Sequence, residues 1–76
     1  INICIKDQSG EKAFFAIKRL ARFGVLARAF AKRKGVKRDS LRFTLDCSIL
    51  LDNDTPHMLK LEDNDQIDVV IRMLGD

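Results

Sequence analysis

The sequence contains one histidine and two cysteines, and it has no tryptophan or tyrosine. Cys4, Cys47 and the lone His57 do not supply the four suitably spaced ligands of a structural metal site, so we expect no metal and no other cofactor. Because no secretory signal is visible, we expect both thiols to be reduced. His57 has no neighbouring nucleophile in the sequence, and there is no glycine-rich phosphate loop. We therefore expect no enzymatic activity.

Long apolar runs are also missing. None approaches the roughly 20 residues that cross a bilayer, and no charged leader with an apolar stretch appears, so we expect a soluble domain without membrane contact. The 76 residues, 46% apolar and 33% charged, suit one compact domain with a small core. We predict a single domain over residues 1–76. Since the first residue is Ile1, we expect an excised piece of a longer protein.

Apolar residues alternate with a period of two in residues 1–6, 13–18, 41–45 and 67–73, which predicts strands; residues 49–51 form a shorter candidate strand. Residues 23–31 instead carry an apolar stripe at helical spacing, and Gly35 is placed to end that helix. The start of the helix is not marked, because residues 20–22 include none of the usual capping residues. Thr55 and Pro56 predict a brief second helical turn.

One helix covers only one face of a sheet, and alternating strands have only one buried face. We therefore predict an α+β fold of the β-grasp type, in which a mixed sheet packs on one helix in the order ββαββ-short helix-β. The first and last strands should lie side by side in the middle of the sheet, joined right-handedly through the helix.

Several segments resemble the SUMO (small ubiquitin-like modifier) family across essentially the whole chain. The most specific stretch comprises Asp52-Asn53-Asp54-Thr55-Pro56, Leu59, Leu61-Glu62-Asp63, Asp65 and Ile67-Asp68-Val69. Further matches are Gln8, Phe15, Lys18, Leu26, Arg33-Lys34-Gly35-Val36, Ser40-Leu41-Arg42-Phe43 and Asp46. The resemblance implies a ubiquitin-like fold and a divergent SUMO-like domain. It also implies nuclear residence, and it leaves a cytoplasmic location open.

The end of the chain departs from the family. SUMO ends in a di-glycine whose carboxylate is joined to a target lysine, whereas the matching positions here are Gly75 and Asp76. The resemblance implies that Asp76 obstructs the narrow enzyme channel, so we expect this terminus to be non-functional in conjugation. We favour a non-covalent SUMO-like interaction module. A conjugatable modifier whose di-glycine end is altered or missing here remains the alternative.

The resemblance implies a peptide groove between the second strand and the helix, in which a short hydrophobic peptide adds as a strand. The matching residues are Ala13, Phe14, Phe15, Ala16, Ile17, Lys18, Val25, Leu26, Phe30 and Arg33. Ala16 and Val25 replace the usual lysines, so we expect a more apolar groove. Core periodicity alone would explain several of these residues. Only Phe14 and Val25 are predicted to point outward.

The resemblance also implies a second face, which contacts the SUMO-conjugating enzyme. Its residues are Asp46, Cys47, Glu62, Asp63 and Asp65. Cys47 and Ile49 depart from a glycine and a basic residue of the family, and a solvated acidic turn would explain the same pattern. The expected partners are therefore this enzyme or SUMO-interacting peptides, and we expect the isolated domain to be monomeric.

Charge is unevenly distributed along the chain. Residues 16–38 carry nine basic and no acidic residues, whereas residues 39–76 carry nine acidic and three basic residues. Such a bipolar field orients charged partners. The basic runs Lys32–Lys34 and Lys37–Arg38 could meet phosphates, but no interleaved exposed aromatics or reading motif accompany them. Nucleic-acid binding is therefore the least favoured function.

Overall fold

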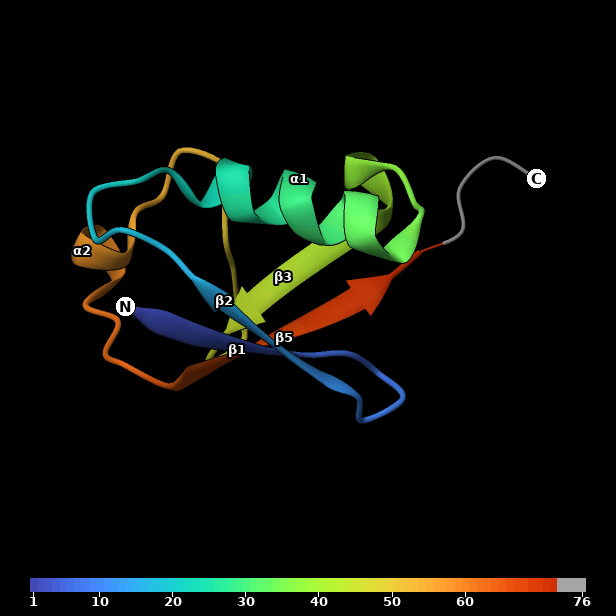
Figure 1. Ribbon diagram of the computed structural model, residues 1–76, viewed down its shortest axis with the longest axis horizontal. Coiled ribbons are helices and arrows are strands. Elements are labelled where there is room, and N and C mark those ends of the chain that lie inside the picture. The colour runs from blue at the N-terminus through green and yellow to red at the C-terminus, as the bar shows by residue number, and fades with distance from the viewer. Residues whose placement is uncertain (73–76) are drawn as a thin grey trace.

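The computed structural model describes residues 1–72 of the chain (Figure 1). Its elements follow one another as β1 (Asn2–Lys6), β2 (Lys12–Ala16), α1 (Phe23–Lys34), η1 (Arg38–Ser40), β3 (Leu41–Leu45), β4 (Ser48–Ile49), α2 (Pro56–Leu59) and β5 (Asp65–Ile71). This is the predicted order, with the short 3₁₀ turn η1 added before β3. The β-grasp fold is confirmed.

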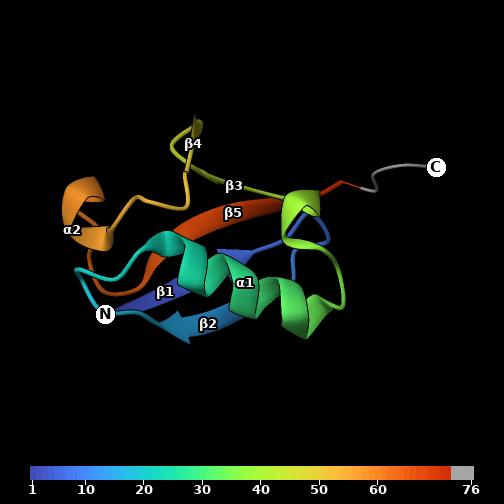
Figure 2. The same ribbon diagram turned by 90° about the horizontal axis from the view of Figure 1, so that it is seen from above.

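The five strands form one mixed sheet in the order β2-β1-β5-β3-β4. β1 and β5 run parallel, with Ile5 opposite Ile67, and the remaining pairs are antiparallel. The first and last strands are therefore neighbours inside the sheet, as predicted. α1 lies across one face only, and β2 and β4 form the two outer edges (Figures 1 and 2).

The core lies between α1 and the facing side of the sheet. Strand side chains alternate, so Phe43 and Val69 are buried while Arg42 and Val70 face the open side. Three edge-to-face ring contacts join the phenylalanines of helix and sheet: Phe23 with Phe43, Phe30 with Phe43, and Phe15 with Phe30. The fold therefore uses most large apolar residues for packing.

The start of α1 is fixed by a distant loop. Arg22 is the N-cap residue and its side chain makes no capping bond. The carbonyl of Asp54 instead accepts from the Phe23 amide at 2.7 Å, and the carbonyl of Asp52 accepts from the Gly24 amide at 2.9 Å. A Cβ added at Gly24 would stand 3.0 Å from Cβ of Asp52, so this close approach favours glycine.

Other helix boundaries follow local signals. Gly35 ends α1 in the left-handed region, with φ of 71°. Thr55 caps α2, because its side chain accepts from the Met58 amide, and Pro56 occupies the first turn. The predictions at both places are confirmed.

The strand boundaries differ from the predictions by a few residues. β2 ends at Ala16, although the Ile17 amide still donates to the carbonyl of Ile1. β4 spans Ser48–Ile49 rather than residues 49–51, because the hairpin turn uses only two residues. β5 begins at Asp65, two residues early, and Met73 of the predicted strand lies outside the described residues.

Candidate functional site

The predicted peptide groove corresponds to the β2–α1 surface, which we define as β2, residues 17 and 18 and the adjoining side of α1. Phe15 is half-buried here and faces α1. Its ring centroid lies 5.9 Å from that of Phe30, and the Arg33 guanidinium lies over the same ring at 5.7 Å. An aromatic ring and a cation therefore meet beside the outer edge of β2.

Several of the predicted groove residues belong to the core. Ile17, Leu26 and Phe30 are buried, with at most 8% of their surface exposed. They support the floor of the surface and offer little area to a partner. Ala13 is half-buried, whereas Ala16 and Lys18 are exposed at the end of β2.

Phe14 and Val25 are both exposed, but on different sides of the domain. Phe14 is 64% exposed and alternates with Phe15, so it lies on the sheet face opposite α1. Val25 is 58% exposed. At 3.6 residues per turn it lies roughly a quarter turn around α1 from Arg33, on the solvent side. The structure therefore does not bring these two residues together.

The predicted conjugating-enzyme face lies where β3 ends and β5 begins, away from β2. Thr44 of β3 is opposite Asp68 of β5, so the Asp46–Cys47 turn that follows β3 lies beside the start of β5. Glu62 and Asp63 lie in the loop that leads into that same strand, and Asp65 is its first residue. We call these five residues the acidic end. The register of the sheet thus assembles two loops far apart in sequence.

Two carboxylates of the acidic end hold the loop itself in place. Asp63 Oδ1 accepts from the Asn2 amide at 2.7 Å, and Asp65 Oδ2 accepts from the Glu62 amide at 2.8 Å. Asp46 and Glu62 are exposed, and no side-chain hydrogen bond of theirs is found within residues 1–72. These two carboxylates are therefore the ones best able to meet a basic partner.

Comparison with known proteins agrees with the β-grasp fold. A family model described as "Ubiquitin-2 like Rad60 SUMO-like" matches residues 1–71. The chain belongs to this SUMO-like family.

The relatives of this SUMO-like domain include a ubiquitin-like protein and small ubiquitin-related modifiers. The chain is 36% identical over 75 residues to the ubiquitin-like protein pmt3/smt3 of Schizosaccharomyces pombe, and the match covers 99% of this chain and 64% of that protein. Small ubiquitin-related modifier 2 of Arabidopsis thaliana is also 36% identical, with 99% and 73% covered. Its namesake in Homo sapiens is 35% identical, with 99% and 79% covered. The chain thus spans about two thirds to four fifths of these relatives.

The predicted conjugation terminus, Gly75 and Asp76, lies outside the described residues. The expectation that this terminus is non-functional in conjugation therefore stays a prediction.

The Asp46–Cys47 turn of this SUMO-like domain has an unusual residue. Both residues have positive φ, 50° and 69°, in a two-residue hairpin loop between paired Leu45 and Ser48. This is the type I′ geometry, in which the second position favours glycine. Cys47 therefore holds a left-handed conformation that costs a cysteine more than a glycine.

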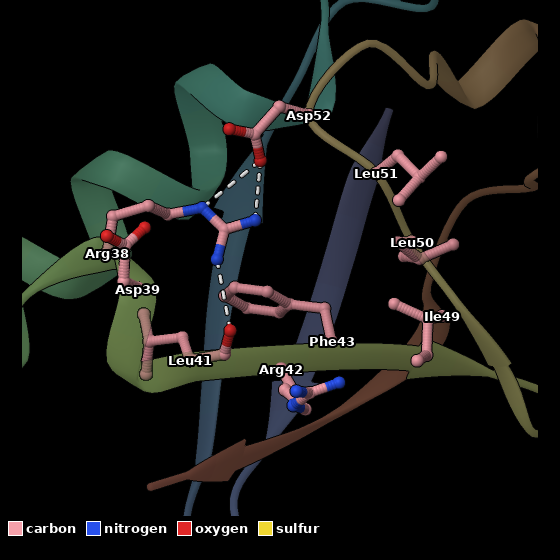
Figure 3. A pocket seen from close by; sticks show the side chains of 9 residues that line it. All are labelled: Arg38, Asp39, Leu41, Arg42, Phe43, Ile49, Leu50, Leu51 and Asp52. Carbon is pink, nitrogen blue, oxygen red and sulfur yellow. Dashed lines mark hydrogen bonds and ion pairs between the residues drawn. The ribbon is translucent and has the colours of Figure 1, made fainter. Parts of the chain in front are cut away.

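A pocket of about 290 Å³ lies between η1, β3 and the segment that follows β4, and the sequence reasoning missed it (Figure 3). Arg38 lies at its side, with its guanidinium 5.4 Å from the centroid of Phe43 and within hydrogen-bonding distance of Asp52. Ile49 and Leu51 line the pocket and are more than half exposed. In the sequence, the only indication of this pocket is that the apolar residues Ile49 and Leu51 stand on either side of Leu50.

Part of the basic segment is committed to internal ion pairs. Lys34 Nζ lies 2.7 Å from Glu11 and 3.3 Å from Asp7. The hydrogen bond to Glu11, with a smaller contribution from Asp7, raises the pKa of Lys34 above its usual 10.5. Hydrogen bonds from Ser9 and Glu11, together with Lys34, hold the pKa of Asp7 below its usual 3.8. Lys34 and Arg38 are therefore poorly placed to bind phosphates.

The cysteines and possible metal ligands are dispersed. Cys4 is buried in β1 and Cys47 is exposed, and both are free thiols. Within residues 1–72 no three His, Cys, Asp or Glu side chains gather as metal ligands. In the same residues, neither helix has the length and apolar composition to span a membrane.

Proposed function

We propose that this SUMO-like domain is a non-covalent protein-interaction module that binds components of the SUMO pathway, either the conjugating enzyme or SUMO-interacting peptides. It is not an enzyme, works as a monomer when isolated, and resides in the nucleus. The cytoplasm is the alternative location.

The observation that carries this proposal is the open edge of β2. β2 pairs only with β1 among the described strands, so main-chain groups on its outer side are available to an added strand. Phe15 and Arg33 lie beside that edge on the α1 side. This arrangement supplies backbone pairing, an apolar contact and a positive charge in one place.

The acidic end supports binding of the conjugating enzyme at a second, separate surface. Asp46 and Glu62 are exposed, and their carboxylates could pair with arginine or lysine across an interface. Because the interaction would be largely electrostatic, its affinity should fall as the salt concentration rises.

The test is a titration of isotope-labelled domain, first with the SUMO-conjugating enzyme and then with an apolar-acidic peptide, followed by backbone amide shifts. We expect the enzyme to shift amides around Asp46, Cys47 and Glu62. We expect the peptide to shift β2 and the neighbouring turns of α1. Asp46→Lys should weaken only the enzyme titration, with Asp39→Lys as a matched acidic control. Failure of both titrations at millimolar partner would contradict the proposal.

The conjugatable modifier is tested separately. The full-length natural protein, rather than a chain that ends at Asp76, is incubated with the SUMO-activating enzyme and ATP. The module predicts no thioester. Thioester formation by the full-length protein would instead favour the modifier. For nucleic acids, we expect a flat oligonucleotide titration at low salt.

A further inference from the structure

Phe14 lies beside the same open edge as Phe15, but on the opposite face of the sheet. Its ring is 64% exposed, which is unusual for an aromatic in a domain whose other phenylalanines are buried or half-buried. Phe14 is paired with Cys4 on the neighbouring strand β1. Cys4 is buried, but it does not belong to the core between the sheet and α1. The ring is placed to shield Cys4 on one side, and most of its surface faces solvent.

A strand that pairs with the outer edge of β2 places some of its side chains on the same face of the sheet as Phe14. An added strand lies about 4.8 Å from β2, and directly opposite residues place their side chains on the same face. The residue opposite Phe15 therefore lies on the α1 side. Its immediate neighbour lies opposite Phe14, on the open side.

We infer that a partner strand added to β2 is bound on both faces, with Phe14 as a specificity-determining contact on the open face. This inference rests on the proposed peptide-binding function. The partner is an extended peptide whose apolar residues are consecutive, because alternate positions would leave either Phe14 or Phe15 without an apolar partner.

The charges at the two ends of β2 indicate beside which end the acidic residues of that peptide lie. At the Lys12 end, the carboxylates of Asp7 and Glu11 are close by and hold Lys34 in ion pairs. At the other end, Lys18 is exposed, and residues 12–38 contain no acidic residue. An acidic segment is therefore attracted to the Lys18 end and repelled at the Lys12 end.

The experiment compares three peptides, each with three glutamates at one end. Each peptide is also made with the glutamates at the other end. One carries four valines; the other two alternate valine with threonine, in the two possible registers. We expect the four-valine peptide to bind roughly two- to fivefold more tightly than either alternating peptide, because one cross-strand pair of this kind contributes up to about fivefold. Calorimetry on the full chain measures the dissociation constants.

Two variants separate the open-face contact from general effects. Phe14→Thr should abolish the preference for four valines and leave binding of the peptide that faces only Phe15 within twofold. Val70→Thr is the matched control, because Val70 is exposed on the same face but lies on β5. It should leave the preference intact. Unfolding curves of both variants check that each remains folded.

The outcomes are distinct. Peptide binding with a preference that survives Phe14→Thr overturns the two-face contact and leaves the proposed function standing. No binding of any peptide to the unmodified domain overturns the inference together with the peptide-binding part of the proposed function, and the titration with the conjugating enzyme then tests the remaining part. Loss of the preference in Phe14→Thr alone supports the inference.

Discussion

Arg38 donates two hydrogen bonds to Oδ1 of Asp52, at 3.2 Å from Nε and 2.5 Å from Nη2 (Figure 3). The same guanidinium donates to the carbonyl of Leu41 at 3.1 Å and covers the ring of Phe43. Asp52 in turn accepts from the first turn of α1 through its carbonyl. Arg38 therefore links η1 and β3 to the loop that caps the main helix.

Replacing Arg38 should destabilise the fold. We expect Arg38→Ala to lower the free energy of unfolding by about 2 kcal/mol, since it removes a carbonyl hydrogen bond, a cation–π contact and a partly exposed ion pair. Chemical denaturation followed by circular dichroism measures the change. Arg28→Ala, at an exposed position on α1, should change it by less than about 0.5 kcal/mol. Equal effects of the two substitutions would contradict this role.

Relieving the Asp46–Cys47 turn should stabilise the fold. We expect Cys47→Gly to raise the free energy of unfolding by about 0.5–1 kcal/mol, because glycine adopts the observed φ of 69° without a Cβ penalty. Cys47→Ser also removes the thiol but keeps the Cβ, so it should leave stability nearly unchanged. A gain with serine as large as that with glycine would assign the effect to the thiol instead.

The close approach at Gly24 should make alanine unfavourable there. Alanine usually stabilises a helix relative to glycine by up to about 1 kcal/mol. Here its Cβ would stand 3.0 Å from Cβ and 3.3 Å from the carbonyl oxygen of Asp52, which also caps the helix. We therefore expect Gly24→Ala to lower the midpoint of thermal unfolding. The matched control Lys32→Ala, at an exposed helical position, should leave it unchanged within about 2 °C.

Acid should weaken the β1–β2 turn through Asp7. Because Asp7 has a pKa below 3.8 in the folded state, its contribution to stability is complete above about pH 3.8 and is lost as the pH falls through the lowered pKa. Ser9 is the main cause, since its hydroxyl donates to Asp7 Oδ1 at 2.6 Å. Ser9→Ala should therefore raise the pKa of Asp7 toward 3.8. A carboxyl-carbon NMR titration measures it, and an unchanged value would assign the shift to the backbone amides or Lys34.

Charge reversal should identify the basic end of the β2–α1 surface. We expect Lys18→Glu to weaken binding of the apolar-acidic peptide by roughly tenfold, since one attractive contact becomes repulsive. Lys12→Glu, at the other end of β2, should weaken it by less than about threefold. Binding measured at two salt concentrations should show the larger salt dependence for the unmodified domain. Equal losses in both variants would contradict the assigned orientation.

Some features of this domain could be predicted from the sequence because the residues that cause them are close together in the chain. Gly35 ends α1 in a left-handed conformation, and Thr55 with Pro56 starts α2, as their residue types predict. The alternation in β3 and β5 and the helical stripe from Phe23 to Ala31 fixed the faces of each element. The cap of α1 could not be predicted from the sequence. The carbonyls of Asp52 and Asp54, which accept from its first amides, belong to a loop roughly 30 residues away.

The candidate surfaces show the same division. The apolar pattern alone could not separate core residues such as Leu26 from contact residues, since both follow helical spacing. It did mark Phe14 and Val25 as outward, but not that they lie on different sides of the domain.

The order of the main helices and strands, the faces they bury and the family resemblance follow from the amino-acid sequence, because periodicity and turn chemistry act over a few residues. Which loops meet at the acidic end, and which edge of the sheet stays open, depends on the folded structure. The convergence of Arg38, Asp52 and Phe43 also depends on the folded structure. These relationships depend on strand order and register, which bring together residues that no local pattern connects.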